Sequence, residues 1–425
     1  MPLPRPLLLP APSEPFSGWT NVAEVPGELG GTLLVLYRSV LLWAETPAAE
    51  RAALFAGGGA GAPAAADGGA ALPAEATAAL RDLHALRAEP GRARAAMVSR
   101  ACDAVSAWAE AEGHSGAALA WARAAAVAYP ANVAAAHRVG ILARRRADYA
   151  TAEAWLQHAG SMARRHGDWY GFVLSLNSLG NLHVQHGEFG QARASLAKAL
   201  GAARRPRGRV EGGRKRLRIR EGYVLHDLMT VSVYTGDFSG AERYAAEAFE
   251  RMRVGSRRLP VLAHDVAGLW MERGRFGRAL EVFQAVLPHF HSQEARARVL
   301  TNLLRAAGAT RRKDAFERHS SEARSILEAM PAAETPAAFW TCLARGEASL
   351  GHWDAAERAS LRAGEVAELR QEADQLAEII PLLESIRLHR YADTLPEAVS
   401  PLDERASRSL ATGLVECLAA MRAGD

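Results

Sequence analysis

Small and apolar residues recur along the chain in a fixed order around short polar turns. Four turns read glycine, a polar residue and an aromatic residue, at 187–189, 236–238, 274–276 and 351–353, and 147–149 repeats the pattern with alanine in place of glycine. A pair of apolar and usually small residues precedes each turn by seven or eight positions, and an alanine follows five positions after each turn begins. Such small residues let two antiparallel helices approach closely. The pattern therefore predicts a series of helical hairpins.

Two weaker copies of the pattern lengthen the series. Gly113 precedes Ala147 by 34 residues, and Pro130 ends the second helix between them. A further copy fits between residues 298 and 330, with small residues at 306–308 and a polar turn at 311–314. We therefore expect about seven hairpins between residues 99 and 370.

The stretch from about residue 99 to residue 369 resembles the tetratricopeptide repeat (TPR) superfamily, whose period is about 34 residues. The best match is the run 177–181 followed by Gly187, Phe189 and Ala192. Most copies are longer, and in this they are similar to the long-helix repeats of bacterial peptide-sensing regulators and adaptors. The resemblance implies an all-α fold, a right-handed α-solenoid of antiparallel helical hairpins. It also implies a non-enzymatic scaffold or regulator that binds a protein or peptide.

The resemblance further implies which side chains line a concave groove. In TPR proteins the first helices of successive repeats line this groove, and the residue ten positions before the turn glycine faces the ligand. The positions ten, six and two residues before each turn of this chain select a polar set of residues. Asn side chains in this set would hydrogen-bond a peptide backbone, and Arg side chains would pair with its acidic groups. A solvated helix face is the alternative interpretation. The expected groove residues are His137, Arg145, Asn177, Asn181, Gln185, His226, Thr230, Tyr234, His264, Glu272 and Arg345.

Both ends of the chain differ from the repeats. Apolar residues predict one helix over 29–55 and a second over 75–88, joined by a Gly/Ala-rich linker at 57–71, so that residues 1–98 form an N-terminal helical cap. After residue 370, Leu402, Leu410, Leu414 and Leu418 fall at helical spacing. We expect residues 371–425 to form capping helices that close the last hairpin.

The net charge of +4 is concentrated in one short segment. Nine basic residues between 204 and 220 accompany a single acid, Glu211, in what we interpret as a solvated insertion of the repeat array. The alternative is a regulator that contacts nucleic acid, a transcription complex or an acidic partner through this loop, which has no aromatic residue for base stacking. The basic residues are Arg204, Arg205, Arg207, Arg209, Arg214, Lys215, Arg216, Arg218 and Arg220.

The dipeptides 226–227 and 264–265, both His-Asp, raise a second alternative, a metal-dependent hydrolase. Both stand at the same place in consecutive repeats, however, and packed helices are about 8–10 Å apart. A bound zinc ion needs nitrogens about 2 Å away. We therefore predict no catalytic residue, no metal and no cofactor.

The three cysteines, Cys102, Cys342 and Cys417, are far apart in the sequence and odd in number. This spacing argues against a disulfide framework and favours a reducing compartment. Prolines interrupt the first ten residues, and no apolar run reaches the about 20 residues that span a membrane. We therefore expect a soluble, cytoplasmic protein.

Overall fold

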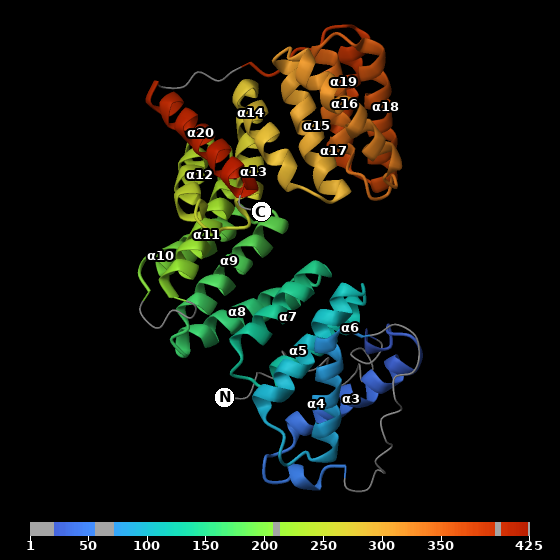
Figure 1. Cartoon of the computed structure of the whole chain (residues 1–425), viewed down its shortest axis with the longest axis vertical. Helices are drawn as coiled ribbons and strands as arrows, with labels where there is room; N and C mark the ends of the chain where they lie inside the picture. The colour runs from blue at the N-terminus through green and yellow to red at the C-terminus, as the bar shows by residue number, and fades with distance from the viewer. Residues whose placement is uncertain (1–20, 56–71, 207–212, 396–400, 424–425) are drawn as a thin grey trace. The chain divides into compact units, whose positions relative to one another are not determined.

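The computed structural model describes residues 21–55, 72–206, 213–395 and 401–423 (Figure 1). These residues form α-helices and short 3₁₀ turns, with no strand among them, which confirms the all-α prediction. They fall into two compact units, Met1–Asp227 and Leu228–Asp425, which we call unit 1 and unit 2. The boundary lies inside one long helix, α11 (Gly213–Tyr234), and not between repeats.

Unit 1 begins with α3 (Gly27–Glu45) and α4 (Ala74–Ala88). The helix predicted over 29–55 ends earlier, at Glu45, because Pro47 disfavours helical backbone in the residue before it, and only the short 3₁₀ turn Arg51–Ala53 follows. The two N-terminal helices pack on the first hairpin, α3 on α6 and α4 on α5. The linker predicted at 57–71 lies outside the described residues.

Three hairpins follow in unit 1, each closed by one residue with a positive φ, at Gly113, Ala147 and Gly187. Within the second and third hairpins a glycine lets the helices touch. A Cβ atom on Gly140 or Gly180 would lie 2.7 or 2.6 Å from the Cγ atom of a leucine on the facing helix. The hairpins are α5 (Ala95–Ala111) with α6 (Ser115–Ala128), α7 (Val133–Arg145) with α8 (Tyr149–Arg165), and α9 (Trp169–Gln185) with α10 (Phe189–Arg204).

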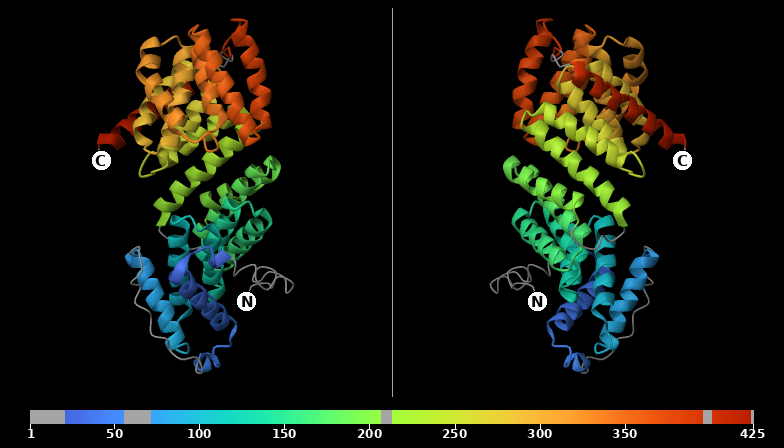
Figure 2. Two further views of the ribbon diagram at one scale, coloured as in Figure 1. Left: turned by 90° about the vertical axis from the view of Figure 1, so that its right-hand side faces the viewer. Right: turned by 90° about the vertical axis from the view of Figure 1, so that its left-hand side faces the viewer.

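Helix α11 pairs with α12 across a turn at Gly236, and three more hairpins follow in unit 2, closed at Gly274, Arg311 and Gly351. Arg311 takes the left-handed conformation, with φ 55°, that Gly236, Gly274 and Gly351 take in the other hairpin turns. The helices are α12 (Phe238–Met252), α13 (Leu259–Glu272), α14 (Phe276–Val286), α15 (Gln293–Ala309), α16 (Lys313–Ala329), α17 (Ala337–Ser349) and α18 (Trp353–Arg370); Figure 2 shows the helices from two further sides.

Two helices complete unit 2, and only one of them closes the last hairpin. Helix α19 (Ala373–Arg387) packs on α18, as a cap would. Helix α20 (Pro401–Ala423) instead packs on α14, with further contacts to α12 and α13 (Figure 1). The expectation that this helix also closes the last hairpin is therefore corrected: α19 already covers α18, and the apolar stripe of α20 is buried on earlier repeats.

Candidate ligand-binding groove

The first helices of successive hairpins in unit 2 line one pocket. It has a volume of about 510 Å³, and its walls come from the C-terminal part of α11 and from α13, α15, α17 and α19. We call this pocket the unit-2 groove. Five of the eleven expected groove residues line it, namely Thr230, Tyr234, His264, Glu272 and Arg345.

The side chains of the groove follow a register counted back from each turn residue. Positions six before the turns supply Thr230, Gly268, Arg305 and Arg345, and positions nine before them supply Asp265, Asn302 and Cys342. The second row differs from the one that the sequence predicts, which stands ten positions before each turn. Arg305 is absent from the prediction because the sequence placed a polar turn at 311–314 without showing which of its residues corresponds to the glycines; the positive φ identifies Arg311. Asn302 is absent because it belongs to the row nine positions before the turn.

A chain of hydrogen bonds forms one wall of the groove. Asn302 Nδ2 lies 3.2 Å from His264 Nε2, and His264 Nδ1 lies 2.9 Å from Asp265 Oδ1. Since the amide donates to Nε2, the imidazole proton is placed on Nδ1, where it is donated to the carboxylate. The Cys342 thiol donates to Asn302 Oδ1 across 3.4 Å. Burial raises the pKa of this thiol, although Arg305 and Arg345 oppose the shift, so the thiol stays protonated.

Two arginines at equivalent positions carry the positive charge of the groove. Arg305 Nη1 pairs with Glu272 Oε1 at 3.3 Å, and Arg345 Nη2 pairs with Glu378 Oε1 at 2.6 Å. The Nε atom of each arginine is buried and has no hydrogen-bond partner among the described residues. Each guanidinium therefore keeps a donor that its carboxylate does not use.

The side of the groove formed by α11 and α13 is more open. The side chain of Tyr234 is 61% exposed, and a Cβ atom on Gly268 would meet nothing within 4 Å. Asp265, Gly268 and Glu272 follow one another along a single face of α13, because they are three and four residues apart. On this face, the carboxylates of Asp265 and Glu272 lie on either side of Gly268, where no side chain covers the backbone.

The described hairpins are TPR-like. Each is closed by a residue with a positive φ, and in two of them a glycine of the first helix touches a leucine of the second. In unit 2 the first helices of successive hairpins share one face.

No family model and no curated protein matches the chain. Among solved structures, it is similar to pilF of Pseudomonas aeruginosa, with 15% identity over 55% of this chain and 93% of that chain and a TM-score of 0.42. It is similar to BtubC (BKLC) from P. vanneervenii, with 19% identity over 51% and 90% and a TM-score of 0.42. A tetratricopeptide repeat protein from Parabacteroides merdae shows 13% identity over 67% and 98% and a TM-score of 0.40.

The other six expected groove residues lie in unit 1, and most are engaged within it. Asn181 Nδ2 donates to Asp227 Oδ2 across 2.9 Å, and Asn177 donates to the same oxygen. The exposed fraction of Asn177 and of His226 is only 3% each. These two side chains therefore lie inside the packed helices of unit 1.

The remaining three differ in their surroundings. His137 Nε2 lies 2.8 Å from Ser178 Oγ, and burial, followed by the charges of Arg220 and Arg144, lowers the pKa of this histidine to about 4. Arg145 pairs with Glu110, whereas Gln185 is exposed. The six expected residues of unit 1 therefore do not line one open groove.

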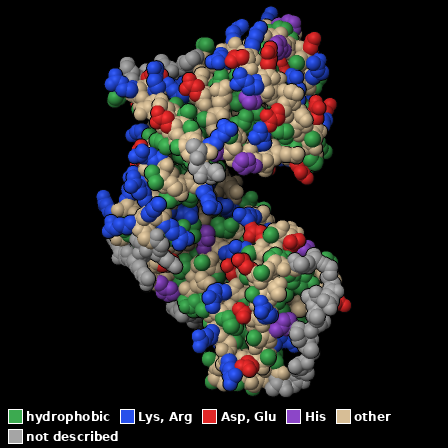
Figure 3. All heavy atoms as spheres, in the orientation of Figure 1, with side chains coloured by type: hydrophobic (Ala, Val, Ile, Leu, Met, Phe, Trp, Pro, Cys, Tyr) green, Lys and Arg blue, Asp and Glu red, His purple; other side chains and the backbone are tan. Residues whose placement is uncertain are grey.

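The basic segment is only partly the loop that the sequence indicated. Arg204 ends α10, and residues 213–220 are the first turns of α11, where Leu217 and Glu221 are buried on one face. Arg and Lys are good helix formers, and the buried face supplies the packing that a helix needs. Arg207 and Arg209 lie outside the described residues. Figure 3 shows Lys and Arg side chains gathered on the face over α10 and α11.

Aromatic rings do accompany this basic helix, although its own loop has none. The Arg216 guanidinium lies 4.2 Å from the centre of the Tyr170 ring, and Arg220 Nη2 donates to Tyr170 Oη across 3.1 Å. Burial alone would raise the pKa of Tyr170, but the two arginines lower it. The contacts bind Tyr170 to the arginines and thereby fix the start of α11 against α9.

The described residues contain no group of three or more His, Cys, Asp or Glu side chains placed to hold a metal ion. His264 instead pairs with its own neighbour, Asp265, and with Asn302. None of the described helices is both long enough and apolar enough to cross a membrane.

Proposed function

We propose that this protein is an interaction scaffold whose unit-2 groove binds an extended segment of a partner polypeptide. The observation that carries the proposal is the convergence of polar side chains from five helices of successive repeats on one pocket of about 510 Å³. A polypeptide backbone offers alternating donors and acceptors, and the groove offers both kinds through Asn302, Thr230 and Gln375.

The shape of the groove supports a chain-like ligand. Gly268 leaves open space above the backbone of α13, which lets a second backbone approach closely. Tyr234 at the rim supplies an exposed ring that can cover an apolar side chain of the ligand. Arg305 and Arg345 each have an N–H donor that no residue of the groove uses, which favours an acidic side chain of the ligand. Binding of a segment is thus supported by shape and by charge.

The chemistry of the groove supports binding over catalysis. Its one thiol, Cys342, has a raised pKa and donates its proton to Asn302, whereas a nucleophilic cysteine needs the thiolate. The imidazole of His264 is held between Asp265 and Asn302 and packs against the rings of Phe283 and Phe290. These residues hold one another in place, as the wall of a binding site requires.

The proposal is tested by filling the groove without disturbing the fold. Gly268→Gln places a side chain in the open space of the groove, and Gly364→Gln places the same side chain in open space on α18, outside it. Both changes replace a helical glycine and should stabilise their helices by about 0.5–1 kcal/mol. We expect partners that co-purify with the unchanged protein and with Gly364→Gln to be lost with Gly268→Gln and weakened by Arg305→Ala.

The dissociation constant of each such partner for the three purified variants then measures the effect. Equal affinities of the Gly268→Gln and Gly364→Gln proteins for every partner would rule out the groove as the binding site.

A further inference from the structure

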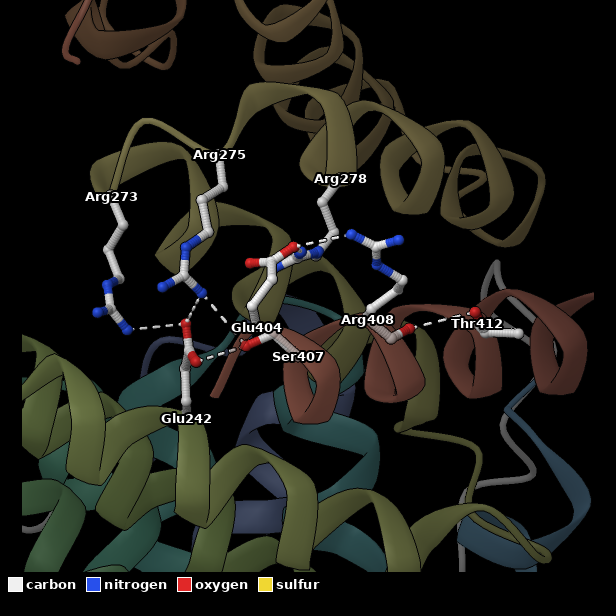
Figure 4. Close-up of polar contacts among 8 residues, drawn as sticks. All are labelled: Glu242, Arg273, Arg275, Arg278, Glu404, Ser407, Arg408 and Thr412. Atoms are coloured by element: carbon white, nitrogen blue, oxygen red, sulfur yellow. Dashed lines mark hydrogen bonds and ion pairs between the residues drawn. The ribbon is translucent and has the colours of Figure 1, made fainter. Parts of the chain in front are cut away.

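Helix α20 is bound to unit 2 by a cluster of charged side chains (Figure 4). The carboxylate of Glu242, on α12, accepts hydrogen bonds from Arg273 Nη1 at 2.9 Å and from Arg275 Nη1 at 2.7 Å. Ser407 Oγ, on α20, donates to the other oxygen of the same carboxylate across 2.6 Å. All three partners of Glu242 are buried, so the first half of α20 rests on a dehydrated polar surface.

The surface beneath α20 carries more positive than negative charge. Arg273 and Arg275 pair with one acid of the repeats, Glu242. The first turn of α20 brings two acids, Asp403 and Glu404, and Glu404 pairs with Arg278. Arg275 Nη2 and Arg278 Nη1 are buried without a hydrogen-bond partner among the described residues. The surface therefore has donors in excess and is matched to a helix whose first turn is acidic.

The second half of α20 is held by close packing of apolar side chains. Leu410, Leu414 and Leu418 are buried along one stripe. Gly413 lies against the ring of Phe249 on α12, where a Cβ atom would come within 2.9 Å of two ring carbons. Beyond α14, His289 Nε2 lies 3.1 Å from the carbonyl oxygen of Leu418. The surface thus selects an acid and a serine at one end of a helix, and a small residue among leucines at the other.

The repeats do not need α20 to satisfy their own charges. If α20 leaves, Glu242 still has Arg273 and Arg275, so no buried carboxylate is left without a cation. Ser407 and Glu404 pass into water with the helix. Most of the stability of a helix in a protein comes from packing of its apolar face, so α20 gains its order from the surface on which it rests.

We propose that the groove between α12 and α14, lined by these arginines and by Phe249, is a second interaction surface of the protein. It binds an amphipathic helix whose first turn is acidic; α20 occupies it within the same chain, and a partner helix with the same pattern takes its place when α20 is released. This surface is separate from the unit-2 groove, since none of the residues around Glu242 lines that pocket.

The first experiment follows the unchanged full-length protein by hydrogen exchange. We expect the amides of α20 to exchange faster than those of α13 and α14, through release of α20 alone. Exchange of α20 only together with α13 and α14, in the unfolding of the whole unit, would show that α20 is a fixed part of the fold and would overturn the proposal.

The second experiment measures binding of a labelled synthetic peptide with the sequence of residues 401–423. Leu414→Glu introduces a charge into the buried stripe and should displace α20, whereas Thr412→Glu introduces the same charge on an exposed face and serves as the matched control. We expect the peptide to bind Leu414→Glu at least about tenfold more tightly than the unchanged protein or Thr412→Glu, because the competing helix no longer occupies the surface.

The charge pairing supplies the specificity test. A peptide carrying Glu404→Lys should bind Leu414→Glu more weakly, and adding Arg278→Glu to that protein should restore its affinity for the altered peptide. Equal binding of the peptide by Leu414→Glu and Thr412→Glu overturns the proposal, as does equal binding of the two peptides. If Leu414→Glu does not fold, the hydrogen exchange of the unchanged protein decides the question.

Discussion

Single polar residues inside unit 1 are held in one ionisation state by their neighbours. His137 is the clearest example: it is paired with Ser178 and surrounded by helices, with Arg220 and Arg144 close enough to disfavour a second proton. Burial and these two charges act in the same direction, and both lower the pKa of the histidine. The packing between α7 and α9 therefore requires the imidazole of His137 to be neutral.

This residue predicts a pH dependence of stability. The pKa of His137 is about 4 in the folded protein and 6.5 in the unfolded chain, so the unfolded chain binds more protons between these values. The stabilisation is complete above pH 6.5 and is lost as the pH falls toward 4. At pH 5 we expect a loss of about 2 kcal/mol, from 1.36 kcal/mol per pKa unit.

Urea unfolding at pH 7 and pH 5 checks this dependence. His137→Gln should remove the part of the pH dependence that comes from this group. His166→Gln, a change at an exposed histidine, should leave it. The same loss of stability between the two pH values in all three proteins would contradict the assignment to His137.

Among the helices of unit 2, α15 and α17 approach each other closely. Gly308 and Gly346 face each other there, and a Cβ atom on Gly346 would lie 2.7 Å from the carbonyl oxygen of Leu304. The obstacle is backbone on both sides, so it cannot be relieved by rotation of a side chain. These two glycines set the distance between α15 and α17, two of the helices that line the unit-2 groove.

A methyl group at this contact should separate the two helices. We predict that Gly308→Ala lowers the free energy of unfolding by about 1–3 kcal/mol, the usual cost of overpacking. Gly364→Ala, at a helical glycine with open space around its α-carbon, should raise it by about 0.5–1 kcal/mol. Thermal unfolding followed by circular dichroism gives both signs, and a Gly308→Ala protein as stable as Gly364→Ala would disprove the close contact.

Over the whole molecule, the basic charge gathers in unit 1. Arg214, Lys215, Arg216 and Arg218 are exposed on the first turns of α11, next to Arg204 and Arg205 at the end of α10. Adjacent cations on one surface attract any polyanion, with an affinity that falls as salt rises. Such attraction carries no sequence preference by itself.

The charge distribution predicts weak, salt-dependent binding of a labelled DNA oligonucleotide. Replacing Arg214 and Lys215 by Glu should lower the affinity and reduce the slope of log affinity against log salt by about two, one for each cation that no longer pairs with a phosphate. The same replacement at Arg298 and Arg318, exposed residues of unit 2, should change the slope less. An unaltered slope in the α11 variant would remove the nucleic-acid alternative.

The repeat pattern was sufficient to predict the helices and the turns between them, because both depend on neighbours in the sequence. A glycine or an equivalent residue with positive φ ends one helix, and small residues late in one helix and early in the next let the two touch. Even the weakest copy was located at the turn that Arg311 closes. The single helix predicted over 29–55 was wrong at its end, however, because apolar spacing alone gives Pro47 too little weight.

Only the tertiary structure decided which side chains meet. A count of ten or nine positions before a turn differs by about 100° around a helix, and packing of the neighbouring repeats determines which of the two is buried. Asn177 and Asn181 had the right chemistry for a ligand, but Asp227 of the next repeat engages both. The place of α20 depends on Glu242 and Arg275, more than 120 residues away, and no local pattern records a contact across such a distance.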